Sequence, residues 1–335
     1  MQKLVFLILL SSVFIFASDI KTDTIEDKNT TFIGDLIHEV SSVLDSNITN
    51  KVKLDTIKTY LQGLELNDKI DTKKYTFNIM GHNETYFFVG GHSSTTLYEK
   101  VWSDATTSTN KYERDKNEAS FQFSFKVPLY QNFLHSNGDL FTAYTQNSYW
   151  QVYNTQYSSP FRETNYQPEL FVEWQNDKKF GNSKLIKSRF SLIHQSNGQD
   201  VGQSRSWNRS ELAFVFQNGN IYFGTNIWDR WNEDAKVDLN ATTGDDNPNL
   251  EKFIGKQKYF VKYKNDRLSL TLAHQNDILN YDRNYGNTKI DLSFPSVNKN
   301  FDFFIRYFSG YGESLVDYNI KINRVSFGIL IADWI

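Results

Sequence analysis

The chain has 335 residues, no cysteine and a formal net charge of -3. Without cysteine it can form neither a disulfide nor a zinc-thiolate site. The near-balanced charge, with no basic patch interleaved with aromatic residues, excludes nucleic acid as the partner.

A secretory signal is predicted at the start of the chain. A basic residue, Lys3, precedes an apolar run that continues to Phe16, and the small residues Ala17 and Ser18 follow. The apolar run is too short to cross a bilayer, and this order of segments is typical of a cleaved signal peptide. We therefore expect residues 1–18 to be removed and the mature protein to lie outside the cytosol.

Residues 19–74 differ in composition from the rest of the chain, being charged, rich in Thr and Asp and poor in aromatic residues. Between Phe32 and Leu44 apolar residues recur at spacings of three and four, which predicts a short amphipathic helix. Disorder is the alternative for this composition. We expect a periplasmic N-terminal extension that is partly helical or disordered.

From Tyr75 onward the hydrophobic pattern has a period of two, which predicts strands with one apolar face. Phe121, Phe123 and Phe125, for example, alternate with polar residues. The predicted strands number about a dozen: Phe77 to Met80, Tyr86 to Gly90, Phe121 to Val127, Leu140 to Tyr153, Glu169 to Gln175, Ser188 to His194, Asn208 to Gln217, Ile221 to Trp228, Gln257 to Lys264, Leu268 to Gln275, Lys289 to Phe294, Phe301 to Phe308 and Val325 to Ile331.

The connections between these strands alternate in length. Asn218-Gly219 and Asn265-Asp266 are typical of tight hairpin turns, whereas Asp229 to Leu250 is a long polar loop. Aromatic residues make up 16% of the chain although hydrophobic residues reach only 39%. These features favour an all-β fold, a transmembrane antiparallel β-barrel of about 12 strands over residues 75–335, with a soluble all-β protein as the alternative.

One segment pairs a base with a nucleophile. His194 and Ser196 are two residues apart on a predicted strand, so their side chains emerge on the same face. Asn208 begins the next predicted strand and could orient the imidazole through its amide oxygen, as a third group does in serine hydrolases. The spacing alone is equally typical of surface polar residues, and a similar run from His135 to Gly138 is interpreted as an ordinary loop.

Several longer runs are similar to a known family. They are His194-Gln195-Ser196-Asn197-Gly198, Ser204-Arg205-Ser206-Trp207-Asn208-Arg209, Tyr144 to Gln151, Ser158 to Tyr166 and Tyr307 to Leu315. Together they resemble the outer-membrane phospholipase A family over about residues 75 to 335. The resemblance implies a twelve-stranded barrel in the bacterial outer membrane that hydrolyses phospholipid acyl esters, with phospholipase A1, phospholipase A2 and lysophospholipase activity.

The same resemblance implies roles for individual residues. Ser196 is expected to be the nucleophile, His194 the general base and then general acid, and Asn208 the residue that orients His194. The backbone N–H of Gly198, together with water on a bound Ca²⁺, is expected to stabilise the oxyanion.

Calcium is the implied cofactor. Its expected ligands are the Ser204 hydroxyl, the backbone carbonyl of Gln199 and the backbone carbonyl of Ser158 from a second subunit, so activity would depend on dimerisation. Asp246 resembles a contributor to a second calcium site. That site is doubtful here, because Val201 stands where an aspartate is expected.

The resemblance also places Gln146 at the interface of a homodimer inside the membrane, with a lumen-facing position as the alternative. For the whole chain, a porin or adhesin barrel is the alternative function. The face on which His194 and Ser196 lie distinguishes the enzyme from the porin or adhesin. Phe190 and Leu192 precede them on the same face of the strand, which predicts that the catalytic pair faces lipid. A soluble esterase is disfavoured because the chain lacks a Gly-x-Ser-x-Gly segment.

Overall fold

The computed structural model describes residues 78–334 apart from 96–97, 101–110, 156–157, 160, 201–202, 235, 238–240, 242 and 278–284. The predicted signal peptide, the predicted extension and Val201 lie outside the described residues. Within the described part of the chain, no helix is long and apolar enough to cross a membrane.

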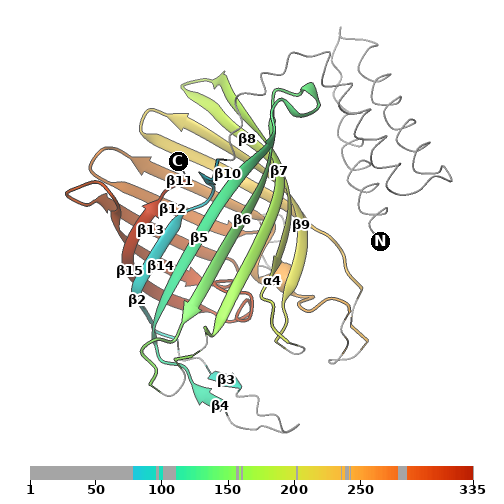
Figure 1. Cartoon of the computed structure of the whole chain (residues 1–335), viewed down its shortest axis with the longest axis vertical. Helices are drawn as coiled ribbons and strands as arrows, with labels where there is room; N and C mark the ends of the chain where they lie inside the picture. The colour runs from blue at the N-terminus through green and yellow to red at the C-terminus, as the bar shows by residue number, and fades with distance from the viewer. Residues whose placement is uncertain are drawn as a thin grey trace, which may run out of the picture. The chain divides into compact units, whose positions relative to one another are not determined.

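Twelve antiparallel strands of the described chain close into a barrel, because β5 pairs with both β2 and β6 (Figure 1). The barrel strands are β2 (Thr85–Ser93), β5 (Asn117–Tyr130), β6 (Asp139–Trp150), β7 (Glu163–Phe180), β8 (Ser183–Ser196), β9 (Ser206–Asn218), β10 (Ile221–Arg230), β11 (Gln257–Lys264), β12 (Ser269–Asn276), β13 (Asn287–Pro295), β14 (Asp302–Gly310) and β15 (Ile322–Ala332). This confirms the predicted fold class. Closure leaves no sheet edge unpaired, as a membrane requires.

Of the predicted strand Phe77 to Met80, Phe77 lies outside the described residues, and among the others only Met80 is in a strand. That strand is the two-residue β1 (Met80–Gly81), which pairs with β5 at Lys126 and Phe125. After β1 the backbone leaves the sheet, and the Asn83 N–H donates to the Ser124 hydroxyl at 3.0 Å instead of to a neighbouring strand. The ring of His82 turns inward there, with Nε2 3.2 Å from a Glu169 carboxylate oxygen.

Side chains alternate between a polar interior and an apolar outer wall. Lys126 and Glu173 form a buried ion pair at 2.9 Å, and Arg306 pairs with Asp291 at 2.7 Å. Large apolar side chains such as Phe327 remain exposed on the barrel surface. This is the reverse of a soluble protein and matches a barrel whose outer wall contacts lipid.

The connections confirm the predicted alternation. Short turns, such as the one at Gly219 with φ of 57°, lie at one end of the barrel, here called the turn end. The other end, the loop end, carries the long connections, including β3 (Tyr98–Lys100), β4 (Lys111–Glu113) and α4 (Leu250–Ile254). The run from His135 to Gly138 lies in the β5–β6 turn, beside the 3-10 helix Phe133–His135, as expected for an ordinary loop.

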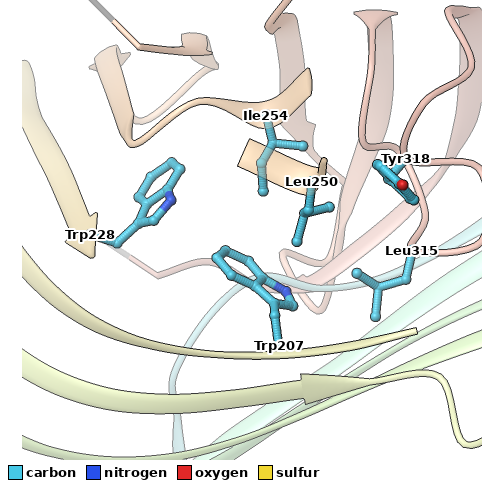
Figure 2. Close-up of a cluster of buried hydrophobic side chains, with 6 residues drawn as sticks. All are labelled: Trp207, Trp228, Leu250, Ile254, Leu315 and Tyr318. Carbon is cyan, nitrogen blue, oxygen red and sulfur yellow. The ribbon is translucent and has the colours of Figure 1, made fainter. Parts of the chain in front are cut away.

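A buried apolar cluster lies at the loop end (Figure 2). Its members come from β9, β10, α4 and the β14–β15 loop: Trp207, Trp228, Leu250, Ile254, Leu315 and Tyr318. These side chains also form part of the wall of an interior cavity of about 350 Å³. The cluster therefore packs the β10–β11 and β14–β15 loops against the interior face of β9, the strand that follows Ser196.

Ion pairs hold the β14–β15 loop at the same end of the barrel. Asp317 accepts from Arg114 at 2.7 Å and from Arg162 at 2.9 Å, and Arg162 also pairs with Glu118 at 2.7 Å. Burial raises the pKa of Asp317, but the two arginines lower it by more, so this pKa lies below its ordinary value.

Candidate active site

Strands β8 and β9 bring the predicted residues together. Their register places His194 directly opposite Asn208, and His194 Nδ1 lies 2.8 Å from Asn208 Oδ1. β9 begins at Ser206, two residues before the predicted start at Asn208, and Asn208 contacts the imidazole from near the beginning of this strand. A carbonyl oxygen can only accept, so Nδ1 must carry the proton and Nε2 is left as the free base.

These side chains lie on the outer wall of the barrel. The residues that alternate with them, Ile193 and Gln195 on β8 and Trp207 on β9, line the interior cavity instead. The His194 side chain is accordingly exposed on the lipid-facing side. The interior cavity is therefore separate from His194 and Ser196, whose side chains lie on the outer wall.

Ser196 ends β8 on the same face as His194. Within the described residues its hydroxyl makes no direct hydrogen bond with the imidazole. Hydrogen bonds of this kind are often long before a substrate is bound. The arrangement therefore holds His194 in the tautomer with a free Nε2. It also places the Ser196 hydroxyl two residues further along β8, on the same face of the sheet.

Asn197 organises the loop that follows Ser196. This side chain is 2% exposed, and its Oδ1 accepts from the Arg205 N–H at 2.8 Å while its Nδ2 donates to the Gln203 carbonyl at 2.9 Å. Its Nδ2 also contacts the Glu163 carboxylate at 3.3 Å. One buried amide thus joins both ends of the loop from 197 to 205 and anchors it to β7.

Gly198, the expected oxyanion donor, has a backbone conformation that favours glycine. Its φ of 62° lies in the left-handed region that glycine adopts without strain. A Cβ at this position would lie 3.2 Å from the Tyr166 ring. The Gly198 N–H forms no hydrogen bond with any described residue, which leaves this donor available.

The expected calcium ligands lie in two loops. The Ser204 hydroxyl donates to Asp246 Oδ2 at 2.7 Å, which fixes the direction of its oxygen lone pairs. The carbonyl of Gln199 makes no hydrogen bond within the described residues. The carbonyl of Ser158, expected to act from a second subunit, accepts from Trp150 Nε1 at 2.7 Å and keeps a second lone pair.

A second calcium site at Asp246 does not fit the residues present. The carboxylate of Asp246 already contacts the Ser204 hydroxyl and forms an ion pair with the Lys236 ammonium. No group of three or more His, Cys, Asp or Glu side chains is arranged to hold a metal in the part of the chain that is described. A divalent cation would have to displace Lys236, which carries a positive charge at this position.

Gln146 lies on the outer wall and not in the lumen. Its neighbours along β6, Thr145 and Asn147, line the interior cavity, whereas Gln146 accepts from the Tyr144 hydroxyl at 3.1 Å. It also donates to Ser148 at 3.1 Å. A polar amide on the outer wall has the sidedness that an interface inside the membrane requires.

The structure adds residues that sequence patterns did not indicate. Glu233, in the β10–β11 loop, accepts from Asn208 Nδ2 at 2.9 Å. On the interior face, Trp207 Nε1 donates to Gln195 Oε1 at 2.8 Å, between β9 and β8, the strands that carry Asn208 and His194. No spacing rule links Glu233 to Asn208, because a long loop intervenes, and only their contact identifies it.

Comparisons with known proteins agree with this geometry. A model of the Phospholipase A1 family matches residues 64–331. The Phospholipase A1 of Proteus vulgaris is 35% identical over 234 residues, covering 69% of this chain and 73% of that protein. The corresponding enzyme of Escherichia coli K12 is 35% identical over 218 residues, covering 65% of this chain and 71% of that protein.

Solved structures show the same fold. Outer membrane phospholipase A from Escherichia coli superposes with a TM-score of 0.66 at 31% identity, covering 77% of this chain and 100% of that chain. The outer membrane phospholipase dimer of Salmonella typhi, described with bound calcium, gives a TM-score of 0.67 at 32% identity, covering 78% of this chain and 95% of that chain.

A closed barrel that superposes on outer membrane phospholipase A defines a β-barrel protein of the bacterial outer membrane. The family model matches most of the barrel and therefore identifies the family. The chain belongs to the Phospholipase A1 family, so it is a phospholipase, an ester hydrolase that acts on membrane phospholipids.

Proposed function

We propose that this phospholipase works by a Ser-His-Asn mechanism that depends on calcium and on dimerisation. Ser196 is the nucleophile, His194 the general base and acid, and Asn208 the orienting residue. The observation that carries the proposal is the 2.8 Å contact between His194 and Asn208 on the lipid-facing wall. A solved variant of the Escherichia coli enzyme, described as an active-site mutant, has an asparagine replaced by alanine, which supports a role for such an amide.

The residues of this chain account for each proton transfer. Ser196 Oγ attacks the ester carbonyl carbon while His194 Nε2 takes its proton, and the oxyanion accepts from the Gly198 N–H. When the C–O bond to the lysophospholipid breaks, His194 returns the proton to the leaving oxygen. Water then attacks the acyl-serine while His194 takes its proton, and His194 returns that proton to Ser196 Oγ as the fatty acid leaves.

Calcium fits one set of oxygen donors in this chain. The Ser204 hydroxyl and the Gln199 carbonyl would hold it, with the Ser158 carbonyl of a second subunit. The hydrogen bond from Ser204 to Asp246 makes the Ser204 oxygen a better ligand, in the manner of outer residues around metal sites. The chemistry that a bound Ca²⁺ supplies at this position is positive charge beside the oxyanion.

Dimerisation completes the proposed site, because one calcium ligand comes from the other subunit. Gln146 lies on the outer wall of β6, where its amide can hydrogen-bond the same surface of a second copy. The Salmonella typhi relative is described as a dimer with bound calcium, which supports this assembly.

A porin-like function has less support from the geometry. A pore would place its selective polar groups in the lumen, whereas His194, Ser196 and Asn208 all lie on the outside. In addition, an apolar cluster centred on Trp207 and Leu250 packs at the loop end of the interior. The exposed position on the outer wall suits an enzyme whose substrate is the bilayer itself.

Phospholipid hydrolysis by refolded protein tests the proposal. Ser196→Ala is expected to abolish fatty-acid release and labelling by a fluorophosphonate probe, and a calcium chelator is expected to abolish release by the unsubstituted protein. Ser206 faces Ser196 in the register of β8 and β9, so Ser206→Ala is the matched control and should remain active. Equal release by Ser196→Ala and the unsubstituted protein would contradict the mechanism.

A further inference from the structure

The Asn208 amide is engaged at both ends. Its Oδ1 lies 2.8 Å from His194 Nδ1, and its Nδ2 donates to Glu233 Oε1 at 2.9 Å. Glu233 lies in the loop after β10 and has no part in the mechanism described above. Its carboxylate makes no ion pair with the described residues, so its contact with Asn208 is not a by-product of another interaction.

We propose that Glu233 is a positioning residue that fixes the orientation of the Asn208 amide and, through it, the tautomer of His194. The inference rests on the proposed function, because it requires His194 to be the base. It extends the Ser-His-Asn group by a fourth residue, supplied by the β10–β11 loop.

The orientation follows from hydrogen-bonding chemistry. An ionised carboxylate can only accept, so the NH₂ of Asn208 must face Glu233. The amide is planar, so its oxygen then faces His194 Nδ1, which must donate. This leaves the Nε2 lone pair free to take the proton of Ser196.

The opposite orientation of the amide would disable the base. If Asn208 turned over, its NH₂ would donate to Nδ1, and the proton of the neutral ring would lie on Nε2. That nitrogen could not then accept from Ser196. The position of the Glu233 carboxylate thus selects the active tautomer of His194. Shape alone cannot do so, because the oxygen and NH₂ ends of the amide are nearly the same size.

Glu233 also supplies charge that asparagine lacks. When His194 takes a proton it becomes an imidazolium on the outer wall, where unpaired charge is costly. A carboxylate bound to the other end of the amide polarises Asn208 and increases the negative charge on its oxygen. Asn208 and Glu233 together can therefore perform the role that a single aspartate performs in other serine hydrolases.

The loop is fixed against β9 beside this contact. The Trp231 N–H donates to the Asn208 carbonyl at 2.9 Å, and the Trp231 indole donates to the Ser210 hydroxyl at 2.9 Å. On the other side of Glu233, the Asp245 N–H donates to the Asp234 carbonyl at 2.8 Å. These bonds position Glu233 from both directions along the chain.

Three substitutions at Glu233 test the proposal, because they differ in whether the new side chain can accept a hydrogen bond from Asn208. Glu233→Gln can still accept and should reduce kcat by no more than about threefold. Glu233→Ala should reduce kcat by about tenfold, as expected for loss of a charge-assisted hydrogen bond at a half-exposed site. Glu233→Lys can only donate and favours the wrong orientation, so its loss should exceed that of Glu233→Ala. KM and the calcium concentration for half-maximal activity should not change.

Two controls separate positioning from a general effect on the loop. Asp234→Asn removes the neighbouring carboxylate and should leave kcat unchanged. In an Asn208→Ala background, the Glu233 substitutions should have no further effect on the residual rate, because the amide through which they act is gone.

Different results would overturn the role of Glu233 and the Ser-His-Asn mechanism on which that role rests. A Glu233→Lys protein that is correctly folded and keeps the original kcat would overturn the inference, as would equal losses in the two backgrounds. Heat-dependent mobility on gels reports folding, and the nearly isosteric Glu233→Gln variant is the safeguard if the lysine variant does not fold. Activity that survives Ser196→Ala would instead overturn the Ser-His-Asn mechanism itself.

Discussion

Replacing Asn197 with alanine should weaken calcium binding while the barrel remains folded. This buried side chain makes two short hydrogen bonds, with the Arg205 N–H and the Gln203 carbonyl, and two longer ones, with the Glu163 carboxylate and the Gln199 N–H. In Asn197→Ala the backbone N–H and carbonyl lose their partners, although both remain in the folded loop.

The expected magnitude follows from these lost contacts. Leaving one buried polar group without a partner costs about 1–3 kcal/mol. Two such groups beside an exposed loop, where water can enter, give a total near the low end, about 2–3 kcal/mol. At about 1.4 kcal/mol for each factor of ten, the ratio of the ordered to the disordered form of the loop should fall roughly 30- to 140-fold.

The assay is the calcium dependence of fatty-acid release by refolded protein. Because Gln199 and Ser204 lie in this loop, the calcium concentration for half-maximal activity should rise by about 30-fold or more. The rate at saturating calcium should largely recover. Gln203→Ala is the matched control, since Asn197 contacts only the Gln203 backbone, and its calcium dependence should not change. A shift of less than about threefold in Asn197→Ala would refute the reasoning.

Three further substitutions have defined outcomes. Asn208→Asp sets two carboxylates at hydrogen-bond distance, which cannot both ionise, so fatty-acid release should fall at least about tenfold and recover when Glu233→Gln is added. Asp317→Asn should lower unfolding free energy by about 3 kcal/mol at pH 7, measured by denaturant titration in detergent. Because the folded pKa of Asp317 is lowered, its contribution is present above the unfolded pKa and disappears as pH falls below about 4, so the difference should shrink there. Lys236→Met frees Asp246, so calcium should raise the thermal midpoint of the monomer more than it does in the unsubstituted protein.

Each of these has a contrary result. Failure of the added Glu233→Gln substitution to restore Asn208→Asp would argue against carboxylate repulsion. A constant stability difference between pH 7 and pH 3 would show that the ionisation of Asp317 does not matter. An unchanged calcium response in Lys236→Met would show that the lysine does not occupy the place of a cation.

The period-two pattern and the turn residues determined the barrel because strand sidedness is a local property. Alternation along Phe190, Leu192 and His194 was enough to predict which residues face outward. The sequence pattern placed Asn208 near the start of the next strand, whereas its register directly across from His194 comes from the folded sheet. The alternation and the strand start depend only on residues close together in the chain.

Contacts made by long loops could be decided only by the tertiary structure. Glu233 reaches Asn208 across 25 positions, and Asp246 reaches Ser204 across 42. Loop conformation depends on many weak contacts and has no period to detect. Among the described residues of the predicted strand Phe77 to Met80 only Met80 is in a strand, and beyond β1 the Asn83 N–H donates to the Ser124 hydroxyl instead of to a neighbouring strand. The sequence by itself therefore determined the barrel and which side chains face outward, because alternation along a strand is local, whereas the folded loops decided which charged groups contact Asn208 and Ser204.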